Sequence, residues 1–191
     1  MSKSSHIVFD IETQFGPQEI QGGWNATDKM GVSCAVVYDF DIDRFEVYSP
    51  LDVEALKERI ESAERVTGFN IWKFDYPVIY GLPGNRRVEK LRFTTDDILR
   101  RIWSALELNP DGFGANHRGW SLGDVCGATI GASKNGSGAH APELFKTGQF
   151  NALIDYCKND VLLTRNLCQH IADHGWVSNS QGLRVEIPPW S

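Results

Sequence analysis

Three separate stretches of the sequence place carboxylates inside patterns that are otherwise apolar. Asp10 and Glu12 end the run IVFDIE, and because residues i and i+2 of a strand share a face, these two carboxylates are expected side by side. Asp75 lies within the apolar and aromatic segment FNIWKFDYPVI. Asp160 interrupts an apolar row of a long helical pattern, and Tyr156 lies one turn before it on the same side.

Each of these acids also has a simpler interpretation. Asp10 and Glu12 could lie at a strand end that faces water. Asp75 could complement the dipole of a helix in its first turn, and Asp160 could be partly exposed and accept a hydrogen bond from Tyr156. The chemical interpretation gains weight because a carboxylate is costly to bury without a partner, and all three stretches share this feature.

Four carboxylates that meet at the carboxyl end of a central strand would form an oxygen-rich site. Such sites suit Mg²⁺ or Mn²⁺ better than zinc. Two of these ions held about 4 Å apart would clamp a phosphodiester, activate a water molecule and stabilise the leaving oxygen. The residues therefore predict phosphoryl chemistry with two divalent metal ions, Mg²⁺ or Mn²⁺, as cofactors.

The elements that must position these acids follow from the hydrophobic periodicity of the chain. We expect strands over residues 7–12, 32–40, 44–49, 65–70, 91–95 and 183–187, and helices over 53–63, 73–82, 96–108 and 149–174, with shorter ones from Ser121 and Pro142 and a long polar loop over 14–31. Antiparallel strands come first and then alternate with helices. This order predicts an α/β fold with a mixed central β-sheet flanked by α-helices.

The same residues closely resemble the three motifs of the DEDD superfamily of 3′→5′ exonucleases. Phe9–Thr13 (FDIET) resembles the first motif of the proofreading domains of B-family DNA polymerases. Gly68–Asn70, followed by Phe74–Asp75, resembles the second. Tyr156–Asp160 (YCKND) resembles the third in its tyrosine form, called DEDDy; the histidine form would have histidine at position 155, where this chain has aspartate.

The resemblance spans about residues 6–172, including a similar stretch from Ser121 to Lys134, and implies a ribonuclease H-like fold. We expect one exonuclease domain over residues 1–191, with a core over about 6–174 and a tail over 175–191. The sequence shows no polymerase or helicase motor pattern, so the expectation is a free-standing enzyme.

The resemblance also implies a role for each acid. Asp10 would bridge both metal ions, Glu12 and Asp160 would complete the shell of the first, and Asp75 would hold the second through water. Tyr156 and Glu12 would position the attacking water. The implied activity is hydrolysis of the phosphodiester bond at the 3′ end of a single strand, with DNA as the expected substrate and nucleoside 5′-monophosphates as products.

Substrate contacts are expected from Thr13, Phe69 and Asn70. In the family the counterpart of Asn70 lies near the terminal nucleotide, and Phe69 could stack on a base. Trp24 and Trp72 are weaker candidates, because most tryptophans pack in a core or at its rim.

The charge of the chain is informative only in its distribution. The net charge of −6 over 191 residues counts against a nucleic-acid-binding protein, unless divalent cations compensate carboxylates locally. Residues 86–101 carry six basic and three acidic side chains, which could contact phosphates or form ion pairs on a solvated helix face. For Arg100 and Arg101 we favour ion pairs, and we interpret Asp96 or Asp97 as a helix N-cap rather than a fifth metal ligand.

The remaining patterns argue against other classes. The four cysteines lack zinc or disulfide spacing and are expected to be free thiols. His170 and His174 are spaced like a metal pair, but near a helix end they more commonly complement its dipole. No apolar run reaches the length of a membrane span and no signal-peptide pattern is present, so we expect a cytoplasmic protein with no membrane partner.

Two alternative functions stay open. The same chemistry could act on RNA, because backbone contacts dominate and no residue that recognises the 2′-hydroxyl can be identified. A catalytically silent module could bind nucleic acid or a protein partner; such modules usually lose an acid, and this chain has lost none. Besides single-stranded 3′ ends, replication or repair proteins are conceivable partners.

Overall fold

A five-stranded mixed β-sheet forms the centre of the computed structural model, which describes residues 5–81, 85–112, 114–134 and 140–190. The strand order is β3-β2-β1-β4-β5, with β1 antiparallel to β2, β2 antiparallel to β3, and β1, β4 and β5 parallel. The strands are β1 (His6–Thr13), β2 (Val32–Asp39), β3 (Arg44–Tyr48), β4 (Arg65–Gly68) and β5 (Thr95–Asp97). The expected mixed α/β sheet flanked by helices is therefore confirmed.

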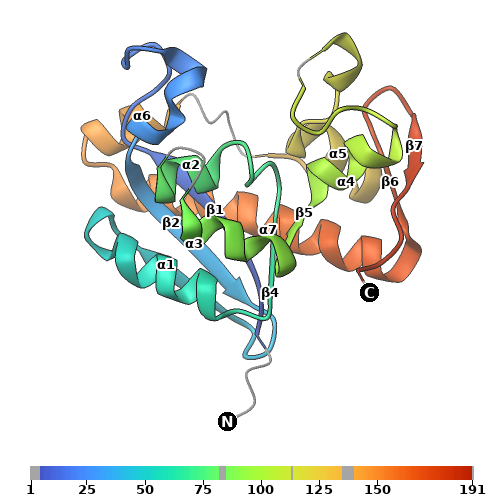
Figure 1. Ribbon diagram of the computed structural model, residues 1–191, viewed down its shortest axis with the longest axis horizontal. Helices are drawn as coiled ribbons and strands as arrows, with labels where there is room; N and C mark the ends of the chain where they lie inside the picture. The colour runs from blue at the N-terminus through green and yellow to red at the C-terminus, as the bar shows by residue number, and fades with distance from the viewer. Residues whose placement is uncertain (1–4, 82–84, 113, 135–139, 191) are drawn as a thin grey trace.

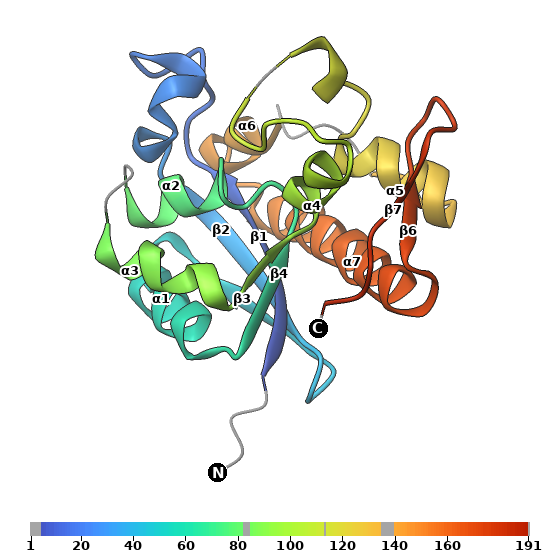
Figure 2. The same cartoon turned by 45° about the vertical axis from the view of Figure 1, so that its right-hand side comes forward.

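Helices cover both faces of this sheet (Figures 1 and 2). The α-helices are α1 (Val53–Ser62), α2 (Asp75–Tyr80), α3 (Arg86–Lys90), α4 (Ile98–Ala105), α5 (Leu122–Ile130), α6 (Ala141–Lys146) and α7 (Phe150–His174). Short 3-10 helices are η1 (Gly23–Lys29), η2 (Pro50–Asp52), η3 (Leu91–Phe93) and η4 (Ala115–His117). The expected helix over 73–82 is shorter at its start, and residue 82 lies outside the described residues.

Strand β1 is central because both of its faces are covered. Ile7, Phe9 and Ile11 point to one face and pack with residues of α1 and α2. Val8 points to the other face and packs with residues of β2, α6 and α7. Since side chains alternate along a strand, Asp10 and Glu12 share the face of Val8 and point toward α7.

The expected strand over 91–95 is wrong in position. Residues 91–93 form the 3-10 helix η3, and β5 begins at Thr95. Arg92 is exposed and Phe93 is 87% exposed, so the segment buries only Leu91 and has no strand face to pair. Helix α4 begins two residues later than expected because Asp97 is its N-cap: the Asp97 side chain accepts hydrogen bonds from the backbone N–H of Leu99 and Arg100.

The segment over residues 14–31 is more ordered than the expected loop. It continues the β1–β2 hairpin through hydrogen bonds from Gln14 N to Gly31 O (2.9 Å) and from Phe15 N to Met30 O (3.1 Å). It then folds into η1, which buries Ala26 and Thr27. We call residues 14–31 the insert; it stands beside the carboxyl end of β1.

The tail forms a second, separate sheet. The expected strand over 183–187 is β7 (Arg184–Glu186), and it pairs with β6 (Trp176–Ser178), which periodicity does not reveal in so short a run. Val177 and Val185 pack with α4, α5 and α7 in one core cluster. Helix α7 ends at Gly175, whose φ of 73° lies in the left-handed region that glycine tolerates.

Two expectations about composition can be compared with the structure. All four cysteines are free and buried, as expected. Among the described residues, no helix is long and apolar enough to cross a membrane.

Candidate active site

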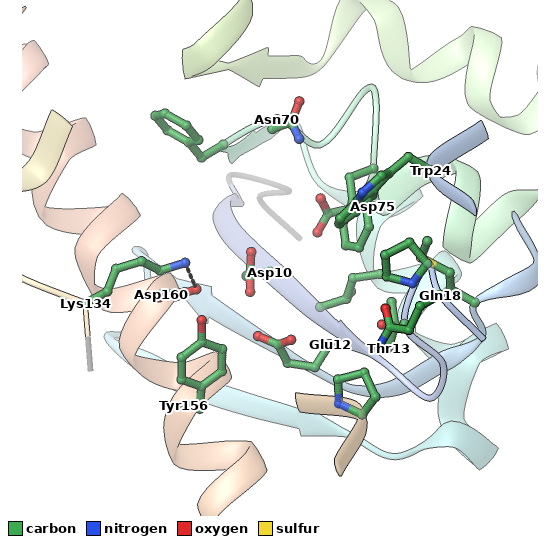
Figure 3. Close-up of a pocket in the computed structure, with 17 residues that line it drawn as sticks. Asp10, Glu12, Thr13, Gln18, Trp24, Asn70, Asp75, Lys134, Tyr156 and Asp160 are labelled. Atoms are coloured by element: carbon green, nitrogen blue, oxygen red, sulfur yellow. Dashed lines mark ion pairs between the residues drawn. The ribbon is translucent and has the colours of Figure 1, made fainter. Parts of the chain in front are cut away.

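The predicted acids from three distant stretches come together around one cavity. Asp10, Glu12 and Asp160 each place a carboxylate oxygen within 4.8 Å of the other two. Asp75, the first residue of α2, lies outside that group but lines the same cavity, and its carboxylate points toward Asp10 (Figure 3). Tyr156 lines it as well. Strand β1 therefore supplies the floor, and α2 and α7 approach it from two sides.

Packing on α7 explains the position of its two site residues. Leu153, Cys157 and Val161 are buried against β1 and β2. Tyr156 and Asp160 each precede one of these residues by one position, which turns them toward the edge of the interface and into the cavity. Asp160 is only 3% exposed despite its charge.

Burial and mutual repulsion make the ionised forms of these acids unfavourable. Burial, and then the charge of Asp160, raises the pKa of Asp10 to about 8. Burial and the charges of Asp10 and Asp160 also raise the pKa of Glu12 well above its usual value. Burial and then Asp10 do the same to the pKa of Asp75. The cluster therefore stores unfavourable free energy that a cation can relieve.

The donor atoms fit a hard divalent cation. The group contains only carboxylate oxygens, which Mg²⁺ and Mn²⁺ prefer. Oδ1 of Asp75 and Oδ1 of Asp160 are buried, and neither has a hydrogen-bond partner among the described residues. Buried acceptors of this kind are costly unless they are bonded to something. Asp10, Glu12 and Asp160 could thus hold a metal ion.

Lys134 is a site residue that the sequence analysis missed. Its Nζ lies 2.6 Å from Oδ2 of Asp160 and 5.7 Å from the centre of the Tyr156 ring. The lysine stem passes close to Gly123, where an added Cβ would lie 3.4 Å from Lys134 Cγ. The available signal was a lysine at the end of the Ser121–Lys134 stretch, but nothing in its spacing indicated a contact with Asp160.

Replacing Lys134 by methionine should show whether the lysine both stabilises ionised Asp160 and competes with a metal ion for it. The lysine charge favours ionised Asp160, so Lys134→Met should lower the melting temperature of the metal-free protein at neutral pH. The same variant should show a larger rise in melting temperature on adding Mn²⁺, because the metal no longer competes with the ammonium group. Lys90→Met, at an exposed lysine on α3, is the matched control. An unchanged response to Mn²⁺ would contradict the competition.

The residues that are expected to contact the substrate line the same cavity as the acids. Thr13, Phe69 and Asn70 all line the cavity, whose volume is about 500 Å³. The Thr13 hydroxyl donates to Phe15 O at 3.0 Å and so also holds the start of the insert. Trp24 lines the cavity too, whereas Trp72 packs against Tyr76 with ring centres 5.0 Å apart.

Asp97 holds the loop that carries Asn70. Its buried carboxylate accepts hydrogen bonds from Asn70 N at 2.9 Å and Trp72 N at 3.0 Å, in addition to its bonds to α4. Asn70 itself has a φ of 67°, a conformation that non-glycine residues rarely adopt. Asp97 thus stabilises the turn at Asn70, five residues before Asp75, and the N-cap interpretation of this residue is confirmed.

We expect Asp97→Ala to destabilise the protein by about 2–3 kcal/mol, because it leaves several buried N–H groups without acceptors. Chemical denaturation measures the change. Asp97→Asn keeps one acceptor oxygen and should cost less. An Asp97→Ala protein as stable as the wild type would show that water replaces the carboxylate.

Other charged groups serve the fold. Arg100 pairs with Asp111 at 3.3 Å and Arg101 with Asp96 at 3.0 Å. The ion pairs favoured from the sequence are therefore present, but Asp96 is a buried residue of β5 and does not lie on a solvated helix face. Arg87 pairs with Glu54 and Glu61. The rings of His170 and His174 lie 4.5 Å apart, but neither belongs to a group of three or more potential metal ligands in the part of the chain that the structure describes.

Comparison with family models and with curated protein sequences found no match. The residues and the geometry of this cavity are therefore what indicates a function.

Proposed function

We propose that the chain is a metal-dependent 3′→5′ exonuclease of the DEDDy type with a ribonuclease H-like fold. One observation carries the proposal: the four motif acids, from β1, α2 and α7, surround a single cavity together with Tyr156. The order β3-β2-β1-β4-β5, antiparallel on one side of β1 and parallel on the other, is compatible with that fold. All four acids are present, which favours an enzyme over a silent binding module.

Some residues of the cavity would hold the metal ions, and others would orient the attacking water. Asp10, Glu12 and Asp160 would provide the oxygen ligands of one ion, and Asp75 faces them from the other side of the cavity. Two divalent ions bound here would supply Lewis-acid stabilisation of the phosphate and lower the pKa of a bound water. Tyr156 and Glu12 orient the attacking water, and most of the rate would come from positioning and charge stabilisation.

The reaction is hydrolysis of the terminal phosphodiester bond. The water oxygen forms a bond to phosphorus, and the bond from phosphorus to the 3′ oxygen of the preceding nucleotide breaks. That oxygen takes up a proton, and a nucleoside 5′-monophosphate leaves.

A single-stranded oligodeoxynucleotide with a 5′ label tests the proposal. With Mg²⁺ or Mn²⁺ the labelled strand should shorten in steps of one nucleotide, and a 3′-labelled strand should release labelled mononucleotide at once. A chelator should stop both. A matched RNA strand, digested in parallel, decides between DNA and RNA. No mononucleotide release with either metal, or full activity in the chelator, would overturn the proposal.

A further inference from the structure

The insert carries an aromatic side chain that the fold leaves uncovered. Trp24 is 68% exposed, whereas the other five tryptophans are buried or half-buried. It is nevertheless a residue of the cavity wall, shared with Asp10, Glu12 and Asp75. The indole of Trp24 is exposed to solvent and borders the buried acids, so it is available for contact with a ligand that enters the cavity.

Trp24 packs on one side against the residue that precedes Asp75. Its ring lies against that of Phe74, with centres 6.1 Å apart, and Phe74 directly precedes Asp75. The insert is also tied to α6, because Lys146 forms an ion pair with Glu19 and lies 5.9 Å from the centre of the Phe15 ring. Figures 1 and 2 show the blue insert standing close to α6. An aromatic side chain that already packs against the fold loses less entropy on binding than one without such contacts.

Trp24 and Phe69 belong to different walls of the cavity. The Phe74 partner of Trp24 packs with the core beneath α1 and α2, whereas Phe69 packs with the core formed by α4, α5 and α7. Figure 3 shows Trp24 across the acidic residues from Lys134 and Tyr156. An aromatic surface is therefore present on each side of the acidic floor.

We propose that Trp24 stacks on an unpaired base of the single-stranded 3′ end, forming a base-binding subsite on the insert. This inference rests on the proposed function, because the acidic floor binds phosphate only through metal ions. Stacking on a neutral base avoids repulsion by the carboxylates and accepts any base, since every base has a π-face. It requires an unpaired base, so it favours single strands over duplex ends.

Steady-state cleavage of a single-stranded oligodeoxynucleotide tests the subsite. We expect Trp24→Ala to raise KM about tenfold, the loss typical of one base stack, with kcat changed less than twofold. Trp24→Phe should recover most of the loss. Phe93→Ala removes another exposed aromatic side chain, one that does not line the cavity, and should behave as wild type.

Abasic residues at the three 3′-terminal positions of the strand provide the decisive comparison. With this substrate, wild type and Trp24→Ala should have the same KM, because the base that Trp24 contacts is missing. Equal KM values on the normal strand, or a tenfold difference that persists on the abasic strand, would overturn the inference.

A binding measurement distinguishes failure of the subsite from failure of the exonuclease. In Ca²⁺, the normal oligodeoxynucleotide should quench the tryptophan fluorescence of the wild type, and Trp24→Phe should lose most of that quenching. Quenching that depends on Trp24 without any cleavage would reject the exonuclease and retain the subsite. Cleavage without a contribution of Trp24 to KM or to quenching would reject only the subsite.

Discussion

Asp10→Asn should abolish cleavage, lowering kcat by about a thousandfold or more while the protein stays folded. Asp10 lies between Glu12 and Asp160 on one side and Asp75 on the other, so it is the acid that can contact both halves of the metal site (Figure 3). Metal ions supply several kcal/mol of transition-state stabilisation, and each 1.4 kcal/mol is a factor of ten in rate. Single-turnover cleavage of the oligodeoxynucleotide, with enzyme in excess, measures the loss.

The matched control is Asp155→Asn, one position before Tyr156 on α7. Asp155 is exposed and does not line the cavity, so its replacement makes the same chemical change without touching the site. We expect wild-type activity from this control. An Asp10→Asn protein that cleaves at more than a tenth of the wild-type rate would show that the chemistry takes place elsewhere.

Asp10→Asn should also make the metal-free protein more stable. The amide removes a negative charge from a cluster whose members repel one another, and it has nearly the shape of the carboxylate. A variant that gains stability as it loses activity is expected where a functional site is strained. Unfolding of both proteins by urea in a chelator, at pH 8, measures the gain.

The sequence was most informative where a charged side chain occupies a position that its neighbours mark as buried. Asp10 and Asp160 interrupt apolar patterns that still predict β1 and α7, because the surrounding side chains are numerous enough to determine those elements. The convergence of the acids depends on parallel pairing of β1 with β4 and on packing of α7 across β1 and β2, which no local pattern encodes. Before the structure, the acids were connected only by their shared position in apolar patterns and by the resemblance of the three stretches to the exonuclease motifs.

The misses have local physical reasons. Lys134 reaches Asp160 through a long flexible side chain that passes Gly123, and such a contact has no periodicity. The displaced β5 reflects Asp97, which caps α4 and holds the Asn70 turn at once, so a polar requirement determines the boundary instead of apolar alternation. In the insert, the few buried residues Ala26, Thr27 and Met30 are enough to order a segment with loop composition.

Stability of the metal-free protein should fall as the pH rises from about 4 to about 8. The pKa of Asp10 is raised in the folded state, to about 8, so the folded protein retains a proton that the unfolded chain releases near pH 4. Such a group stabilises the fold fully below its unfolded pKa, and the contribution is lost as the pH rises through the folded pKa. Glu12 and Asp75, whose pKa values are raised as well, act in the same direction.

His6 makes the opposite contribution to the pH dependence of stability, so its effect must be separated from that of the acids. Burial, and then the charge of Arg65, lowers the pKa of His6 to about 4, so this group favours the folded state at high pH and loses that contribution as the pH falls. The difference between wild type and Asp10→Asn cancels His6, because both proteins contain it. That difference in melting temperature should widen from pH 5 to pH 8.

A divalent metal ion should counteract the loss of stability at high pH. An ion that binds the carboxylates displaces their protons and stabilises only the folded state, so the rise in melting temperature on adding Mg²⁺ should be larger at pH 8 than at pH 5. Calorimetric titration in two buffers of different ionisation enthalpy should detect proton release, most of it absent in Asp10→Asn. Equal shifts at both pH values, or binding without proton release, would mean that the ion does not bind at these acids. In that case the raised pKa values would reflect a buried cluster of neutral carboxyls, and the site would lack the charge that two-metal chemistry requires.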